Sequence, residues 1–218
     1  MFMRLLDISL AGLGLLVIAP LLLVVAILVA VMSGRPVIYR SQRMGQRGRV
    51  FSLLKFRTMR QDADSVGPGI TGRNDSRVTP IGRILRRTKV DELPQLINVL
   101  KGDMSLVGPR PEDPRYLDCY SAADRRLLEM RPGLTSPASI AFRNEEALLD
   151  GPDFEMRYVK TVLPAKLSMD LSYMQSRTLW SDVKVIAETA LMLLGRDVHP
   201  RAKLPPHRAF FLSLGKKS

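Results

Sequence analysis

Two adjacent carboxylates, Asp91 and Glu92, are the residues of this chain best suited to chemistry. An ionised aspartate can act as a nucleophile and pass through an acyl-phosphate. A carboxylate pair can also hold Mg²⁺, which usually takes one or two carboxylates together with substrate phosphates. Farther along, a Gly-Pro-Arg-Pro turn presents Arg110 on a stiff backbone, and arginine binds phosphate through charge-assisted hydrogen bonds. The pattern predicts a phosphate-handling site in which Asp91 and Glu92 are the catalytic and metal-binding candidates.

The sequence around this pair predicts a short amphipathic helix. Asp91 is a good N-cap, Pro94 falls in the first turn, where a missing N–H costs nothing, and Gly102 suits the C-terminal end. Apolar side chains recur at helical spacing, at Leu93, Leu96, Ile97 and Leu100. An ordinary capped helix followed by a loop would give the same local pattern, so both interpretations stay open at this point.

The composition of the chain narrows the chemistry further. Its 218 residues carry a net charge of +12, which predicts an anionic partner such as a phosphorylated substrate or an anionic lipid. Aromatic residues are few and do not interleave with the basic ones, so nucleic acid is not expected as a partner. One cysteine, Cys119, excludes an internal disulfide and a Cys-based zinc site. The two histidines lie in a basic, Pro-rich tail, which leaves a carboxylate mechanism as the one this inventory permits.

The N-terminal part of the chain is an apolar segment long enough for a membrane. From Ile8 to Gly34 there are 27 residues without a charge. As one straight helix the segment would be about 40 Å long, which exceeds the hydrocarbon core of a bilayer, about 30 Å. Pro20 interrupts it near the middle and predicts a kink. The segment is therefore either a kinked span, which sequence physics slightly favours, or a helix that enters and leaves the membrane on the same face.

Basic residues after this segment place the rest of the chain. Residues 34–60 contain eight Lys and Arg and no acid, and such residues stay on the cytoplasmic side. The arginines of this stretch are expected to rest on anionic membrane lipid. Lys55 and Arg57 have a second interpretation, in which they point into a phosphate-binding cleft.

The remaining elements follow from periodicity and turn residues. The fold class expected is α+β and mostly helical, with a Pro-kinked membrane helix over 1–34, a compact cytoplasmic catalytic domain over 35–198 and a basic Pro-containing tail over 199–218. A β-hairpin is expected over Val37–Met59, a loop over Asp62–Thr79 and a turn over Arg131–Thr135. Helices are expected over Pro80–Arg87, Tyr116–Met130, Phe154–Tyr173 with a break at Pro164, and Asp182–Leu194. Ile81, Ile84, Leu85, Val183, Ile186, Leu191 and Leu194 are expected to face inward.

Three segments of the chain resemble one protein family. They are Lys55–Met59, the long motif Lys89–Pro111 and Arg131–Thr135, and together they are similar to the bacterial sugar transferases. These are the monotopic phosphoglycosyl transferases that begin the assembly of polysaccharides and glycoconjugates. The resemblance extends from the apolar helix to about Leu194, and the chain looks like the minimal catalytic form, without the N-terminal membrane bundle of larger relatives.

This resemblance implies a specific reaction. Members transfer a sugar-1-phosphate from a UDP-sugar to a polyprenyl phosphate such as undecaprenyl phosphate, with Mg²⁺ and release of UMP. The aspartate of the acidic pair, here Asp91, forms a covalent phosphosugar, and Glu92 assists the metal site or the attack of the acceptor. Positions that line the site or bind phosphate correspond here to Lys55, Arg110, Arg143 and Asp170, and Arg57 and Tyr173 are further candidates for substrate binding. The family's helix is re-entrant. Together with the basic residues that follow the apolar segment, this predicts a monotopic protein on the cytoplasmic face of the bacterial inner membrane. A homodimer is also compatible with the sequence.

The chain departs from the family pattern in three places. Relatives often have Ser before the kink proline, where this chain has Ala19. They commonly read Thr-Gly after the Pro-Gly turn, where this chain has Thr135 followed by Ser136. An Asn-Gly-Arg segment is replaced here by residues 141–146, so the correspondence at Arg143 is weaker, and this region is expected to tune the choice of sugar. The alternative function is a membrane-anchored basic binding module without catalysis.

Overall fold

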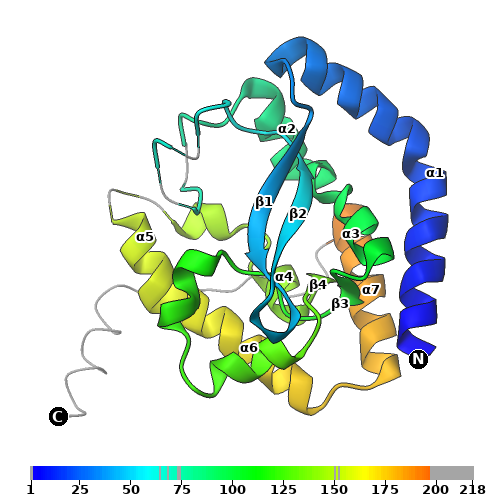
Figure 1. Cartoon of the computed structure of the whole chain (residues 1–218), viewed down its shortest axis with the longest axis vertical. Coiled ribbons are helices and arrows are strands. Elements are labelled where there is room, and N and C mark those ends of the chain that lie inside the picture. The colour runs from blue at the N-terminus through cyan, green and yellow to red at the C-terminus, as the bar shows by residue number, and fades with distance from the viewer. Residues whose placement is uncertain are drawn as a thin grey trace.

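The computed structural model describes residues 2–63, 65–67, 69–72, 75–149, 151 and 153–196. The tail expected over 199–218, with both histidines, lies outside the described residues. Helix α1, Phe2–Ser33, is the one helix of the described part that is long and apolar enough to cross a membrane. Pro20 lies inside it, and Figure 1 shows the axis of α1 changing direction between its lower and upper halves. The expected long apolar helix is therefore present, and its bend agrees with the expected kink.

The start of α1 is attached to the rest of the molecule by side-chain hydrogen bonds. Near its start, the Arg4 guanidinium donates to the carbonyl oxygens of Val99 at 2.6 Å and Leu100 at 2.9 Å. The buried Asp7 carboxylate accepts from the Ser105 hydroxyl at 2.7 Å and from the Leu106 amide at 2.9 Å. Along its length, α1 places one row of side chains against the domain and leaves most of its other apolar residues exposed.

The β-hairpin is where the sequence predicts it. Strands β1, Ile38–Met44, and β2, Val50–Phe56, pair antiparallel, and the register places Tyr39 opposite Lys55. The turn between them includes Gly48, whose φ of 72° lies in the left-handed region that glycine tolerates best. Both strands are longer than the β-prone cores in the sequence, because pairing extends them to include residues with no strong β preference.

The remaining elements form the domain around this hairpin (Figure 1). The α-helices are α2 (Pro80–Thr88), α3 (Gln95–Lys101), α4 (Pro137–Ala141), α5 (Phe154–Arg157), α6 (Leu163–Gln175) and α7 (Leu179–Leu193). Short strands β3 (Ser105–Val107) and β4 (Gly133–Thr135) pair in parallel. Tight helical turns are η1 (Gln46–Gly48), η2 (Val90–Glu92), η3 (Pro114–Cys119), η4 (Asp124–Glu129) and η5 (Glu145–Leu148), and η6 (Tyr158–Val162) is a π-helical stretch that joins α5 to α6. The fold is α+β and mostly helical, as expected.

Separate apolar clusters hold the layers together. One joins α1 to α3 through Ala11, Leu96 and Val99, and a second joins α1 to α2 and the hairpin through Val29 and Leu85. The largest lies under η3, η4, η5 and α6 and is built on Tyr158 and Leu163, among others. Because α1 contributes to two of these clusters, the membrane helix is packed as part of the domain.

Two predicted elements are different in the structure. The helix expected over Tyr116–Met130 is divided into η3 and η4, because Tyr120 is extended and the Asp124 carboxylate accepts from the Ser121 amide at 3.0 Å. Such a local side-chain bond offers the backbone an alternative to the helix. The turn expected over Arg131–Thr135 contains β4, whose partner β3 lies far away in the sequence.

Three residues predicted to face inward are exposed. They are Ile84 at 59%, Val183 at 43% and Leu194 at 78% relative exposure. In α2 the buried positions are Ile81, Gly82 and Leu85, so the face against the core is narrower than the apolar pattern indicates. A periodic pattern identifies an apolar stripe but not which edge of that stripe is covered.

Candidate active site

The acidic pair lies in a tight turn between α2 and α3. Lys89, with φ of 59°, ends α2 in the left-handed conformation, and η2 carries Asp91 and Glu92 directly after it. The expectation that Asp91 caps α3 is wrong: α3 begins at Gln95, and no side chain caps it. The amides of Glu92 and Leu93 donate to carbonyls within the turn, at 3.2 Å each, so no carboxylate is needed there. The Asp91 side chain is left for another purpose.

Glu92 links two cations. Its Oε1 accepts from the Arg110 guanidinium at 2.7 Å and from the Lys55 ammonium at 3.3 Å. Burial by itself would raise the pKa of Glu92, but Arg110 and Lys55 hold that pKa well below its usual value. Glu92 is therefore ionised and fixes both cations beside Asp91.

Asp91 has a different environment from its neighbour. It is 6% exposed, and burial, followed by the charge of Glu92, raises its pKa, while Lys55 and Lys89 act in the opposite direction. Its Oδ1 is buried and has no hydrogen-bond partner among the described residues. A buried oxygen of this kind is costly to leave unsatisfied, so Oδ1 is available to a ligand that enters the site.

The backbone of Arg110 is held in place by contacts with residues outside its own turn. The Gly-Pro-Arg-Pro turn leaves β3 at Gly108, where a Cβ would come within 2.5 Å of the Arg131 carbonyl oxygen, so only glycine fits. On α6, the Asp170 carboxylate accepts hydrogen bonds from the backbone amides of Arg110 and Ala138, each at 3.4 Å. Asp170 thus supports the turn that carries Arg110 and the start of α4.

Burial raises the pKa of Asp170 to about 6, against an ordinary value of 3.8. Since the folded protein binds this proton more tightly than the unfolded chain, Asp170 favours folding below about pH 4, and that contribution is lost as the pH rises through about 6. The loss amounts to about 3 kcal/mol, at 1.36 kcal/mol per pKa unit. Asp170→Asn removes this loss, so from pH 4 to 7 its free energy of unfolding should fall less, or rise more, than that of the native protein. Denaturant titrations in detergent at several pH values test this, and equal slopes would contradict it.

A buried charge network that sequence reasoning missed extends from the site. The Lys166 ammonium donates to Glu112 at 2.8 Å and to Glu145 at 3.1 Å, and Tyr158 donates to Glu112 at 2.6 Å. Lys166 and Asp170 lie on the same side of α6 as the buried Leu163 and Leu167. Charges inside an apolar helical stripe were the signal that could have pointed to this network.

Two cavities meet at these residues. A polar pocket is lined by Asp91, Glu92, Lys55, Arg110 and Arg143, together with the charge network. An apolar groove, lined by Leu93, Leu134, Phe142, Met192 and Leu193, among others, shares Lys89, Glu92, Arg110, Arg143, Glu145 and Lys166 with the polar pocket. The structure thus brings five of the predicted site residues together in the polar pocket. An anionic ligand in this pocket would meet an apolar ligand in the groove.

Arg86 holds two walls of the polar pocket. Its guanidinium donates to the Thr71 hydroxyl at 2.7 Å and to the Glu146 carboxylate at 3.0 Å. Thr71 belongs to the loop predicted over Asp62–Thr79, and residues 69–71 of this loop line the pocket.

A family model described as bacterial sugar transferase matches residues 1–196. The chain belongs to the bacterial sugar transferase family. A UDP-glucose:undecaprenyl-phosphate glucose-1-phosphate transferase of Caulobacter vibrioides is 39% identical over 89% of this chain and 70% of its own length. A protein of the same name from Escherichia coli K12 is 38% identical over 83% of this chain. A UDP-N-acetylgalactosamine-undecaprenyl-phosphate N-acetylgalactosaminephosphotransferase of Aeromonas hydrophila is 33% identical over 86%.

Coverage of the relatives is uneven. The chain spans 37% of the length of the Escherichia coli relative and 42% of the Aeromonas one. Their names differ in the sugar, which is glucose in one and N-acetylgalactosamine in the other. Membership in the family therefore does not select a sugar for this chain.

The residues of the acidic pair fit Mg²⁺ when a phosphate ligand is also present. Oδ1 of Asp91 is an unsatisfied, buried carboxylate oxygen, which is a ligand that Mg²⁺ prefers. The Glu92 carboxylate already accepts from Lys55 and Arg110. Among the described residues there is no cluster of three His, Cys, Asp or Glu that would hold a metal without a substrate. Asp91, with Glu92 beside it, would hold the ion together with phosphate oxygens.

Arg57 and Tyr173 are placed away from the polar pocket. The Arg57 guanidinium is buried and donates to the carbonyl oxygens of Ser33, Gly34 and Arg35, where α1 ends. Helix C-termini leave such carbonyls without partners, and a cation there is also favoured by the helix dipole. The Tyr173 hydroxyl donates to Asp182 at 2.6 Å and ties α6 to α7. Tyr173 therefore lacks support from this geometry for its predicted role in substrate binding, whereas Arg57 lines a separate cavity beside the hairpin.

The contacts of Arg57 predict a stability effect. Arg57→Met should lower the free energy of unfolding by roughly 2–4 kcal/mol, because the carbonyls at the end of α1 lose their donor. Arg40→Met, an exposed arginine on the same hairpin, is the matched control and should change stability by less than about 0.5 kcal/mol. Unfolding in detergent compares the two variants, and equal stabilities would show that Arg57 does not anchor the helix.

Proposed function

We propose that this protein transfers a sugar-1-phosphate from a UDP-sugar to a polyprenyl phosphate, in the first membrane step of polysaccharide or glycoconjugate assembly. The observation that carries the proposal is the unsatisfied Oδ1 of Asp91, buried beside fixed cations in a polar pocket that adjoins an apolar groove. The names of the relatives, which specify sugar-phosphate transfer to undecaprenyl phosphate, agree with this reaction.

The first half of the reaction uses Asp91 as nucleophile. Its carboxylate attacks the phosphorus that bears the sugar, the bond from that phosphorus to the bridging oxygen breaks, and UMP leaves with the electron pair. Lys55 and Arg110, both held by Glu92, offset the charge that develops on the phosphate oxygens. When bound by Asp91 and Glu92, Mg²⁺ supplies further neutralisation of the phosphates. An acyl-phosphate bond to the sugar phosphate is the product of this step.

In the second half of the reaction, the acceptor reaches the phosphosugar from the apolar groove. A phosphate oxygen of the polyprenyl phosphate attacks the same phosphorus, the bond to Asp91 breaks, and the carboxylate is restored. The apolar groove, with Leu93, Phe142 and Met192 among its residues, suits the first part of the polyprenyl chain. Glu92 and Arg110 line both cavities and are placed to face the incoming phosphate.

The membrane topology proposed is re-entrant, on the cytoplasmic face of the bacterial inner membrane. Arg4 and Asp7 attach the start of α1 to the domain, and Arg57 attaches its end. A helix whose two ends are bonded to one domain has both ends on the same side of the bilayer. In a Cys119→Ser background, Met3→Cys should be labelled only from the cytoplasmic side, and labelling from the periplasm would overturn this topology.

A panel of UDP-sugars with Mg²⁺ tests the reaction. Without acceptor, the matching donor should release about one equivalent of UMP and add the mass of one sugar phosphate to Asp91, mapped by peptide mass spectrometry. Addition of undecaprenyl phosphate should remove the adduct and restore turnover. UMP release that occurs only with acceptor and without an adduct would contradict the covalent step, and no release with any donor would contradict the function.

A further inference from the structure

A third cavity lies on the hairpin side of Asp91. This hairpin pocket shares Asp91, Lys55 and Arg43 with the polar pocket and extends along β1 toward Tyr39 and Arg60. It is distinct from the apolar groove, with which it shares no lining residue among those described. A ligand held at Asp91 therefore has two polar directions in which to extend, as well as the apolar one.

One wall of the hairpin pocket is a regular strand face. Alternate side chains of a strand point to the same side, so Tyr39, Ser41 and Arg43 of β1 share one face. Tyr39 lies directly opposite Lys55 in the register, and Lys55 contacts Glu92. Strand pairing fixes this row of an aromatic, a hydroxyl and a guanidinium, and its guanidinium, that of Arg43, lines the polar pocket as well.

The charges that line the two polar cavities differ. Each cavity is lined by seven of the described Lys and Arg side chains, but the polar pocket offsets them with five carboxylates, those of Asp91, Glu92, Glu112, Glu145 and Glu146. Among the described residues of the hairpin pocket, Asp113 is the one carboxylate besides Asp91, and Arg115 pairs with it at 2.9 Å. Carboxylates accept hydrogen bonds from sugar hydroxyls, whereas an arginine-rich cavity favours an anion.

We propose that the hairpin pocket binds the nucleoside monophosphate part of the donor, while the sugar occupies the carboxylate-lined polar pocket. The leaving group is the more anionic part of the donor, and it departs along β1 with its phosphate near Arg43 and its base against Tyr39. This assignment rests on the proposed function. It adds the direction in which the donor lies and the residues that retain UMP.

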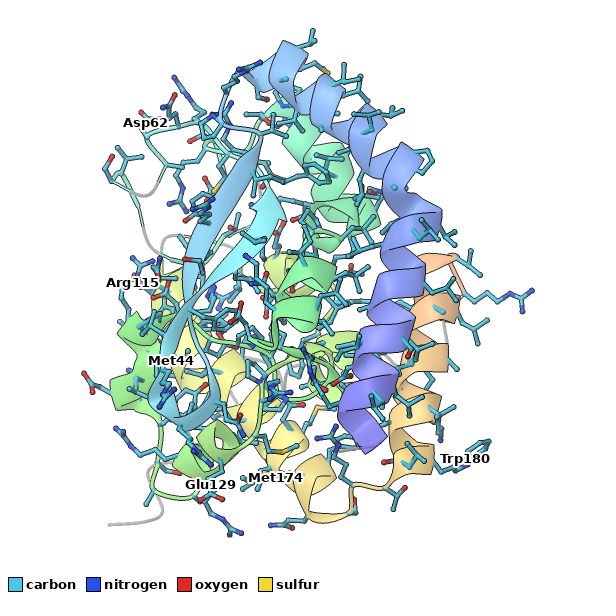
Figure 2. The ribbon with its side chains drawn as sticks, turned by 45° about the vertical axis from the view of Figure 1, so that its right-hand side comes forward. Met44, Asp62, Arg115, Glu129, Met174 and Trp180 are labelled. Atoms are coloured by element: carbon cyan, nitrogen blue, oxygen red, sulfur yellow. The ribbon has the colours of Figure 1, made fainter. Side chains whose placement is uncertain are left out.

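The opening of the hairpin pocket is suited to a soluble ligand. Figure 2 shows Arg115 on the side of the hairpin away from α1, whereas Trp180 lies on the side of α1. Arg115 lines the pocket and is 56% exposed in its side chain. An anionic lipid headgroup has the same phosphate chemistry, so the experiment has to separate the two sources.

Two substitutions, each with a matched control, test the subsite directly by UMP binding. Tyr39→Ala should weaken the binding of UMP about tenfold, the effect expected for loss of base stacking, whereas Tyr39→Phe should retain it. Arg43→Met should also weaken UMP binding, and Arg40→Met, on the exposed opposite face of the same strand, is its matched control. Isothermal titration with UMP and full-length protein in detergent gives these affinities without turnover.

The two half-reactions separate a subsite from a structural defect. In Tyr39→Ala the KM for the donor should rise, while transfer from a preformed adduct, freed of UMP, to undecaprenyl phosphate should keep its rate. Equal loss in both half-reactions, or unchanged affinity for UMP, would overturn the subsite. A variant that binds vesicles containing phosphatidylglycerol less well but retains UMP would assign the pocket to lipid. If the native protein releases no UMP from any donor, the proposed function fails, whereas native activity with an unaffected Tyr39→Ala refutes only the subsite.

Discussion

Asp91→Asn should reduce sugar-phosphate transfer by roughly 10⁴-fold or more, the scale seen when a covalent nucleophile is removed. The amide cannot attack phosphorus, and the adjacent carboxylate does not take its place, because Glu92 is committed to Lys55 and Arg110. Loss of the adduct mass should accompany loss of turnover. Steady-state UMP release and intact mass spectrometry measure the two effects on the same sample.

The control for this variant is Asp118→Asn. Asp118 is an exposed aspartate of η3, so its substitution should leave the rate within about twofold of the native value. Glu92→Gln gives a second comparison, since it should retain adduct formation at a reduced rate if Asp91 is the nucleophile. Full turnover by Asp91→Asn would require another nucleophile and would favour the alternative in which the acidic pair is only structural.

Lys166→Met should produce the largest loss of stability, about 3–5 kcal/mol, because it leaves Glu112 and Glu145 without their cation. Burial raises the pKa of Glu112, and Lys166 is the first of the groups that bring it below its ordinary value. Without Lys166 the buried carboxylate either remains charged at high cost or takes up a proton. Chemical unfolding in detergent measures the loss.

A second substitution distinguishes the lost charge pair from lost packing. Glu112→Gln in the Lys166→Met background removes the unpaired charge and should recover part of the stability, so the two changes should be non-additive. Lys160→Met, an exposed lysine on the adjoining helical stretch, is the matched control and should be nearly neutral. Additive losses in the double variant would show that Lys166 acts through packing with Tyr158, whose ring centroid lies 5.1 Å from its ammonium.

The elements of the fold that depend on local pattern were predictable. The apolar run with Pro20, the hairpin with Gly48 and the short helix ending at Gly102 follow from periodicity and from residues with special backbone preferences. The helix expected over Tyr116–Met130 failed for a local reason as well, since the bonds between Ser121 and Asp124 compete with the helix. Parallel pairing of β3 with β4 had no local signal, because strands of three residues are fixed by their partner.

The sequence by itself determined the acidic pair, the rigid arginine turn and the membrane-sized helix, because each of these features depends only on residues that are consecutive in the chain. Tertiary structure decided what surrounds them. It separated the environments of Asp91 and Glu92, assigned Arg57 to the end of α1, and buried Lys166 between Glu112 and Glu145. It also made Asp170 a support for Arg110. Burial and charge pairing depend on residues far apart in the chain, so the ionisation and the partners of a site appear only when the chain is folded.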